Sequence, residues 1–274
     1  MRKIGIEEQK KLELDILDYF DKLCSEKGLT YFLAGGSLLG AIRHRGFIPW
    51  DDDIDVMMPR KDYEKLKEVF PHHEYYRFLH FGNTHNYPKA FGTINDSRTY
   101  KPESKIRKKC QYIGVNIDIF PIDSLPDDKE DIHEFFNEIS AMAHKNFCIT
   151  YSYGKSDTLM LTIKRFLGIF LYRFMEFCGL MSVDKLVEQY SVLAQKYNST
   201  ESKMCAVTCS YIYGEREVNV KADYYPVKRV PFEGRNYCIP ANYDAYLTGL
   251  YGNYMQLPPI EKQIPHHDVC YWKE

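Results

Sequence analysis

Residues 51–56 read Asp-Asp-Asp-Ile-Asp-Val, the densest run of acidic side chains in the chain. Residues two apart on a strand point to the same face, so we expect Asp53 and Asp55 to lie together and Asp52 to face the other way. Two carboxylates held side by side repel each other unless a cation lies between them. Oxygen ligands of this kind suit Mg²⁺ or Mn²⁺, with Asp51 as an extra ligand or a supporting residue.

A glycine turn stands shortly before these acids. Residues 31–34 are apolar and long enough for a short buried strand, which Gly35, Gly36 and Ser37 then break. We expect Ser37 to cap a helix over residues 38–43. The free N–H groups and the dipole at a helix N-terminus favour an anion such as phosphate. A phosphate cradle beside a metal-binding strand is the equipment for chemistry on a phosphate ester or anhydride.

Three further side chains of this stretch are candidates for substrate binding. Arg43 and Arg45 lie between the glycine turn and the acids, where they could reach a diphosphate or simply carry surface charge. Trp50 could contact a quaternary ammonium group, although a buried anchor for the turn explains it equally. His44 fits a structural role better than a catalytic one.

A second acidic strand is expected within residues 114–123. Its aliphatic residues alternate, which leaves Asp118 on the opposite face, flanked by isoleucines. A charge on a buried strand needs a partner, and a shared metal ion would supply one. Asp118 is therefore the natural third carboxylate of the site. Asp123 follows Pro121, and we expect it in a turn or a cap.

The run GGSLLGAIRHRGFIPWDDDIDV, residues 35–56, resembles the signature of the LicD family, which includes fukutin and the fukutin-related protein. The superfamily of that family has a polymerase-β-like nucleotidyltransferase core. Its pattern of Gly-Gly/Ser, Asp-x-Asp and a later acid falls here on Gly36, Ser37, Asp53, Asp55 and Asp118. The run YLTGLYGNYMQLPP, residues 246–259, resembles the closing motif of the family, which is a wall of the active site.

The resemblance implies transfer of phosphocholine from CDP-choline to a sugar hydroxyl, with release of CMP and dependence on Mg²⁺. The acceptor would be a glycan or lipid-linked glycan of a cell-surface glycopolymer, such as teichoic acid, capsule or lipopolysaccharide. Asp118 would take the acceptor proton. CDP-ribitol or CDP-glycerol as donor, and nucleotidyl transfer from an NTP, remain alternatives. A non-catalytic nucleotide-binding protein is the alternative of another class.

The composition is that of an ordinary globular protein. The 274 residues are 45% hydrophobic and 27% charged, with a net charge of −2, so no basic field points to nucleic acid. Eight scattered cysteines and an N-terminus without a signal peptide predict reduced thiols in the cytoplasm. A zinc site formed by Cys205, Cys209, His267 and Cys270 is the alternative, but the chain has no CxxC pair.

Periodicity predicts an α/β fold in one domain, residues 1–274, with a mixed sheet and helices on one face. A helical insertion is expected at about residues 127–200. The expected strands beyond the two acidic ones are 76–81, 89–95 and a hairpin of 225–232 with 235–239. The expected helices beyond the glycine turn are 7–28, 59–70, 131–150, 159–179, 183–197 and 243–250.

The helix expected over residues 159–178 is apolar almost all round. Lys164, Arg165 and Arg173 interrupt it, so no uncharged run approaches the roughly 18 residues of a spanning helix. It is either a buried helix of the insertion or an interfacial helix on the inner face of the membrane. The second reading would bring the protein to a lipid-linked acceptor.

Overall fold

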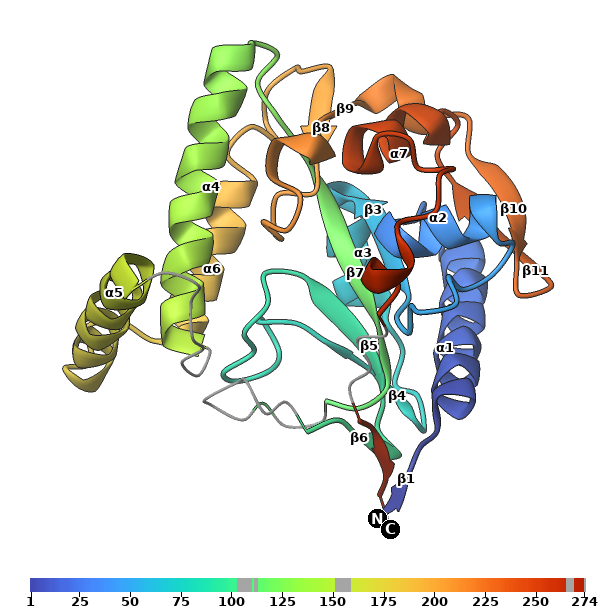
Figure 1. The fold of residues 1–274 in the computed structure, drawn as a ribbon, viewed down its shortest axis with the longest axis horizontal. Coiled ribbons are helices and arrows are strands. Elements are labelled where there is room, and N and C mark those ends of the chain that lie inside the picture. The colour runs from blue at the N-terminus through green and yellow to red at the C-terminus, as the bar shows by residue number, and fades with distance from the viewer. Residues whose placement is uncertain (103–109, 111–112, 151–158, 265–268, 274) are drawn as a thin grey trace.

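The computed structural model describes residues 1–102, 110, 113–150, 159–264 and 269–273, and within 159–165 it describes the backbone alone. A mixed sheet forms the centre, in the order β2-β3-β7-β5-β4 (Figure 1). Only β3 and β7 run parallel among these neighbours. The strands are β2 (Phe32–Leu33), β3 (Asp55–Pro59), β4 (Tyr76–Leu79), β5 (Gly92–Asp96) and β7 (Asn116–Ser124). The predicted mixed α/β fold is therefore confirmed.

Two helices cover one face of this sheet, α1 (Ile6–Lys27) and α3 (Arg60–Val69). Tyr19 of α1 packs on Tyr76, with ring centroids 5.0 Å apart, and Tyr63 of α3 packs edge-on against Phe78 at 6.1 Å. Tyr76 and Phe78 are two residues apart on β4 and therefore share a face. Both helices thus lie on the same side. The prediction that the helices lie on one face holds for these two only, because the helix Gly35–Arg43 lies on the other side, against the Asp55 side chain.

The register between β3 and β7 decides which side the acids face. Asp55 is paired with Asp118, and Asp118 is paired with Thr93 on β5. Ile94, one residue further along β5, is paired with Phe78 of the helix-covered face. Because neighbouring residues of a strand alternate, Asp55 and Asp118 point away from α1 and α3. The aliphatic residues between the acids are fully buried, as predicted.

The chain completes that second side from its C-terminal part. The elements of that part are β8 (Met204–Ala206), η1 (Gly214–Glu217), β9 (Asn219–Val220), η2 (Lys221–Tyr224), β10 (Lys228–Phe232), β11 (Arg235–Ile239), α7 (Tyr243–Tyr251) and η3 (Ile260–Lys262). From the N-terminal part, α2 (Gly35–Arg43) packs against α7 and β10. β8 pairs with the far end of β7, and β10 pairs with β11 in the predicted hairpin. Figure 1 shows α7 beside α2 above the sheet.

Three helices follow one another between β7 and β8 (Figure 1): α4 (Lys129–Thr150), α5 (Leu159–Phe177) and α6 (Val183–Ala194). All three were predicted, and their starts agree within two residues. The buried reading of α5 is wrong, because most of its described large apolar side chains are more than half exposed. No described helix is long and apolar enough to cross a membrane.

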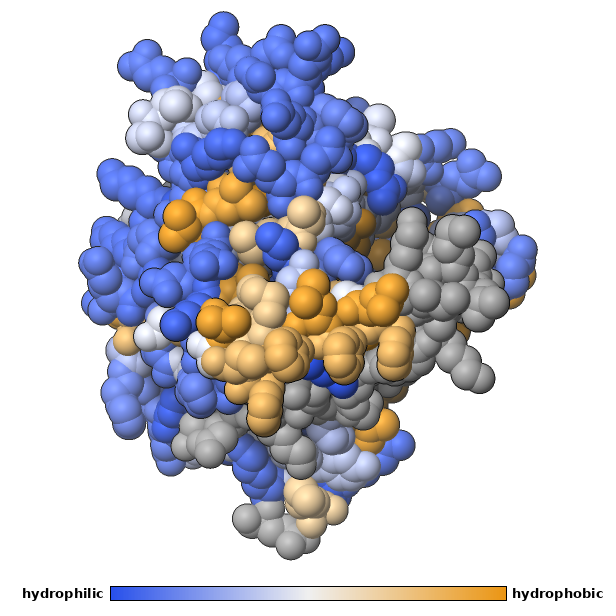
Figure 2. All heavy atoms as spheres, turned by 90° about the vertical axis from the view of Figure 1, so that its left-hand side faces the viewer, coloured by the Kyte–Doolittle hydropathy of each residue, from blue (hydrophilic) through white to orange (hydrophobic). Residues whose placement is uncertain are grey.

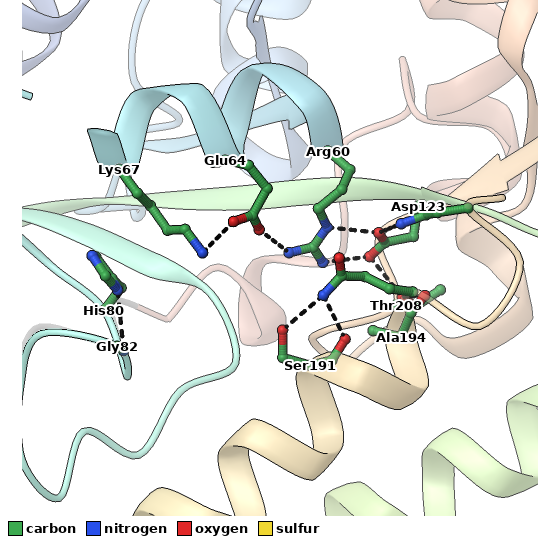
Figure 3. A network of polar contacts seen from close by, with 11 residues as sticks. Arg60, Glu64, Lys67, His80, Gly82, Asp123, Ser191, Ala194 and Thr208 are labelled. Carbon is green, nitrogen blue, oxygen red and sulfur yellow. Dashed lines mark hydrogen bonds and ion pairs between the residues drawn. The ribbon is translucent and has the colours of Figure 1, made fainter. Parts of the chain in front are cut away.

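Asp123 corrects a second expectation. It lies inside β7 and not in a turn, because the strand continues through Pro121 to pair with β8. Its carboxylate is buried and receives two hydrogen bonds from Arg60, each 2.7 Å long (Figure 3). Asn198, just after α6, donates a further bond of 2.7 Å, and Thr208 donates one of 3.3 Å. This network ties the end of the helical region to the central sheet.

The two ends of the chain meet in a small second sheet. β1 (Arg2–Lys3) pairs with β12 (Tyr271–Trp272), which pairs in turn with β6 (Thr99–Tyr100). Arg98, just before β6, lies over the Trp272 ring at 5.5 Å. This pairing places both termini at the end of the molecule that Figure 1 shows at the bottom.

Candidate functional site

A cavity of about 730 Å³ lies where the acidic segment, η1 and the closing stretch of the chain meet. Three parts of the chain line it: residues 34–55, residues 207–217 with Phe120, and residues 246–264. The predicted closing motif, residues 246–259, supplies one wall, with Tyr246, Tyr251 and Tyr254 among its lining side chains. Segments that are far apart in sequence therefore share one cavity.

Three of the predicted acids meet at this cavity. Asp51, Asp53 and Asp55 line it, whereas Asp52 is buried outside the lining, as predicted. Asp118 is not among the lining residues, although it is paired with Asp55 on the neighbouring strand. One detail differs from the expectation. Strand β3 begins only at Asp55, because its partners in β2 and β7 pair with residues 55–59, so Asp53 lies in the segment before the strand.

Burial and mutual repulsion shift the carboxyl pKa values upward. Burial, followed by the charges of Asp51 and Asp118, raises the pKa of Asp53 to about 7. Burial and the charge of Asp53 raise the pKa of Asp55 well above its usual range. Burial also raises the pKa of Asp51, which shares a side-chain hydrogen bond with Asp53. A cation bound here would remove this repulsion, so the donor chemistry suits Mg²⁺ or Mn²⁺.

The ligand set itself stays a prediction. Across the described ranges, no three His, Cys, Asp or Glu side chains already converge on one metal position. The Asp118 carboxylate is held instead by Lys89, whose Nζ lies 3.1 and 3.2 Å from its two oxygens, and by Asn116 at 2.8 Å. Lys89 was not singled out in the sequence, because a lone lysine before a strand carries no signal.

The zinc alternative finds no support in the part of the chain that the structure describes. Cys205, Cys209 and Cys270 are buried. His267 lies outside the described residues. No group of three metal-binding side chains forms around these thiols within those ranges. The preference for buried thiols agrees with this arrangement.

The turn before α2 works differently from the prediction. The helix begins at Gly35 with Ala34 as its N-cap, so Ser37 is not the cap. Gly35 takes a φ of 48°, a left-handed conformation that suits glycine. The helix begins three residues before the predicted start at residue 38. The Ser37 hydroxyl accepts a hydrogen bond of 2.8 Å from the Asp55 N–H. Ser37 therefore fixes the backbone of the acidic segment.

Both glycines leave room for acidic side chains. A Cβ on Gly36 would lie 2.5 Å from Oδ2 of Asp51, and one on Gly35 would lie 3.4 Å from Oδ2 of Asp55. The Gly35 N–H donates to the Tyr246 hydroxyl at 3.3 Å. The first hydrogen bond of the helix runs from Leu38 to Ala34, so the Gly36 and Ser37 amides precede it and suit an anion.

The structure separates the two predicted arginines. Arg43 lines the cavity, and its guanidinium donates to the Tyr254 carbonyl at 2.7 Å, which ties α2 to the closing wall. Arg45 is exposed and is not part of the described lining. Trp50 is half-buried and lines the cavity, with its ring edge-on to His44 at 6.4 Å.

Sequence reasoning missed the deepest acid of the cavity. Glu217, the last residue of η1, lines the cavity, and burial raises the pKa of its carboxyl to about 8. Tyr213, on the same segment, bonds the Tyr251 hydroxyl through its own at 2.8 Å. No motif surrounds Glu217 in the sequence, and η1 packs against α4 and α7, which are distant in sequence.

Comparison with known proteins relates the chain to a family. The domain family described as LicD/FKTN/FKRP, nucleotidyltransferase domain, matches residues 28–153. The lipopolysaccharide cholinephosphotransferase LicD of Haemophilus influenzae is 32% identical over 97% of both chains. An uncharacterized protein of Rickettsia prowazekii is 32% identical over 58% of this chain and 56% of its own. The human ribitol 5-phosphate transferase FKRP is 45% identical over 42 residues, 15% of this chain and 8% of its own.

The similarity to the Haemophilus protein runs from end to end, so it covers the acidic segment, Asp118 and the closing wall together. It supports the resemblance that residues 35–56 first indicated. On this ground the chain belongs to the LicD family.

Proposed function

We propose that this protein is a phosphotransferase that moves phosphocholine from CDP-choline to a sugar hydroxyl of a cell-surface glycopolymer and releases CMP. The observation that carries the proposal is the full-length similarity to a lipopolysaccharide cholinephosphotransferase. The cavity supports it, because closely spaced acids and a helix N-terminus line a space of about 730 Å³. Lipopolysaccharide is the favoured acceptor class, with teichoic acid and capsule as the other candidates.

The core would then be a polymerase-β-like nucleotidyltransferase fold, with α4 to α6 inserted in a single domain. The description of the matching family as a nucleotidyltransferase domain supports this assignment. So does the placement of Asp55 and Asp118 on adjacent parallel strands, on the face opposite α1 and α3.

Asp53, Asp55 and Asp118 would hold a divalent cation, with Asp51 as an extra ligand or a supporting residue. The cation would neutralise charge on the diphosphate and on the departing CMP. The Gly36 and Ser37 amides would bind a phosphate oxygen of the donor. The acceptor hydroxyl forms the new P–O bond while the bond to CMP breaks, and Asp118 takes the hydroxyl proton. For this, Asp118 must exchange its contact with Lys89 for one with the acceptor.

Calorimetric titration tests the proposal. CDP-choline, CDP-ribitol, CDP-glycerol and CTP are each titrated with and without Mg²⁺, and CMP release is followed with a lipopolysaccharide acceptor. We expect Mg²⁺-dependent binding of CDP-choline to be tightest. Preference for CDP-ribitol or CDP-glycerol would change the donor and keep the chemistry. Preference for CTP would indicate nucleotidyl transfer, and binding without CMP release would favour a non-catalytic protein.

We propose that α5 lies on an anionic membrane surface. This contact would bring the protein to a lipid-linked acceptor. Large apolar side chains recur on α5 every three or four residues, each more than half exposed: Phe166, Leu167, Phe170, Leu171, Phe174 and Phe177. Figure 2 shows the apolar band on that face of the molecule. The helix has three cations in its sequence and one acid, Glu176, near its end, which complements anionic lipid.

Vesicle flotation tests this contact. We expect the protein to float with vesicles that contain phosphatidylglycerol. The double variant Phe170→Ser, Phe174→Ser should stay unbound in the bottom fraction of the gradient. Val192→Ser is the matched control, because Val192 is an exposed apolar residue of α6. A wild-type protein that does not float with any vesicle, or a double variant that floats equally well, would overturn the proposal.

A further inference from the structure

The carboxyl group of Glu217 is buried without a partner. The residue is only 6% exposed, its Oε2 is buried, and neither carboxyl oxygen has a hydrogen-bond partner among the described residues. Leaving a polar group in this state costs roughly 1–3 kcal/mol, and more when the group is charged. Such a group calls for an explanation, and a ligand that supplies the missing partner is one. Burial raises its pKa to about 8, and the charge of Arg216 offsets only part of that effect.

Glu217 lines the same cavity as the predicted phosphate and metal site. Tyr213 and Tyr246 line this cavity as well. Burial raises the pKa of Tyr213, and the charges of Asp55 and Glu217 both add to that shift. The charge of Glu217 likewise raises the pKa of Tyr246, whose hydroxyl contacts the Gly35 N–H. Glu217, these two tyrosines and the Asp51–Asp55 end therefore line one cavity.

The chemistry at this end selects a particular kind of ligand. The lining that includes Glu217 also includes Phe120, Val207, Tyr213 and Tyr246. A single buried acid among apolar and aromatic side chains cannot satisfy the several hydroxyls of a polyol such as ribitol. Metal ions need more ligands, and no group of three forms here within the described ranges. A bulky organic cation needs one negative charge, apolar contact and aromatic faces, which this lining supplies.

We propose that Glu217, with Tyr213 and Tyr246, binds the quaternary ammonium head of choline while the phosphate lies at the Asp51–Asp55 end. This subsite deepens the proposed function and rests on it, because it assigns the part of the protein that recognises choline. Glu217 would be a specificity-determining residue that touches the donor and takes no part in the transfer of the proton.

The first test is a change of charge at constant shape. Glu217→Gln is compared with Glu215→Gln, an exposed acid of the same turn that is paired with His133. Calorimetry with CDP-choline, CDP-ribitol and CMP, all with Mg²⁺, gives the affinities. We expect Glu217→Gln to weaken CDP-choline at least roughly tenfold, because a desolvated charge interaction is lost, and to leave CDP-ribitol and CMP unchanged. Glu215→Gln should change none of them.

A second test changes the ligand. The uncharged analogue of CDP-choline, with carbon in place of the ammonium nitrogen, should bind the wild-type protein at least roughly tenfold more weakly. That difference should disappear in Glu217→Gln, because the two changes remove the same interaction. If the variant does not fold, the analogue alone still decides the question, since equal affinity for the two donors would overturn the proposal.

The outcomes separate this inference from the proposed function. Wild-type protein that binds CDP-choline while Glu217→Gln binds it equally well overturns the subsite and leaves the function standing. Equal loss of all three ligands makes Glu217 structural, and loss of turnover without loss of binding makes it a proton acceptor; either overturns the subsite. Wild-type binding of CMP and CDP-ribitol but not CDP-choline overturns the choline donor and the subsite together.

Discussion

Asp53 combines two properties that a single substitution can separate. Its carboxyl lines the cavity, and its pKa of about 7 means that burial and its acidic neighbours disfavour the charged form. We expect Asp53→Asn to lower CMP release about a hundredfold or more, because a ligand of the cation worth several kcal/mol is lost. The variant should melt no lower than the wild-type protein at about pH 8, because it removes a charge that the neighbouring acids make unfavourable.

The control for this prediction is Asp52→Asn. Asp52 is the adjacent acid and has the same side chain, but it does not belong to the cavity lining. Its loss should reduce CMP release far less than the loss of Asp53. An Asp53→Asn protein with wild-type turnover would contradict the assignment of this acid.

Gly36 offers a steric test at the same scale. A methyl group there would meet Oδ2 of Asp51 at 2.5 Å and displace the carboxylate. We expect Gly36→Ala to weaken Mg²⁺ binding about tenfold while the fold is kept, since alanine suits a helix better than glycine. Gly5→Ala is the control, because nothing lies within 4 Å of its added methyl group. Unchanged Mg²⁺ affinity in a titration of Gly36→Ala would exclude Asp51 from the site.

At the scale of elements, the pair of Arg60 and Asp123 joins α3, β7 and the end of the helical region (Figure 3). Removal of one partner leaves a buried charge alone, so Asp123→Ala should lower the free energy of unfolding by roughly 3–5 kcal/mol in urea. Glu64→Gln, at the exposed edge of the same network, should cost under about 1 kcal/mol. Similar losses in both variants would show that burial of the pair is unimportant.

At the scale of the whole molecule, the acidic cavity makes stability depend on pH and Mg²⁺. The folded-state pKa of Asp53 is raised to about 7, so its contribution to stability is greatest at low pH and falls as pH rises through 7. Glu217 adds a loss as pH rises through about 8. Mg²⁺ competes with the proton for the acids, so its stabilisation should grow with pH.

Thermal melts at about pH 6 and about pH 8, with and without MgCl₂, measure this effect. The expected result is a larger upward shift of Tm by Mg²⁺ at the higher pH. Asp53→Asn should reduce the shift at pH 8. An equal Mg²⁺ shift at both pH values would mean that the raised carboxyl groups do not hold the ion.

Local chemistry determined much of this protein from its sequence. The alternation around Asp55 and Asp118 predicted two acid-bearing strands with buried aliphatic neighbours, and Gly28 correctly ended α1 in a left-handed conformation. The run of residues 35–56 indicated the family, which full-length similarity then showed. Helices and hairpin followed from spacings of three to four and of two residues, which depend only on neighbours in the chain.

Tertiary structure decided what depends on residues far apart in sequence. Ser37 accepts a hydrogen bond from the Asp55 amide and does not cap a helix. Asp123 lies within a strand, because β8 pairs with it and Arg60 binds its carboxylate. The apolar face of α5 is exposed. Glu217 shares a cavity with the acids only because η1 packs against distant elements, α4 and α7. A side chain's burial, charge and partners come from the packing of distant segments, and no local pattern records that packing.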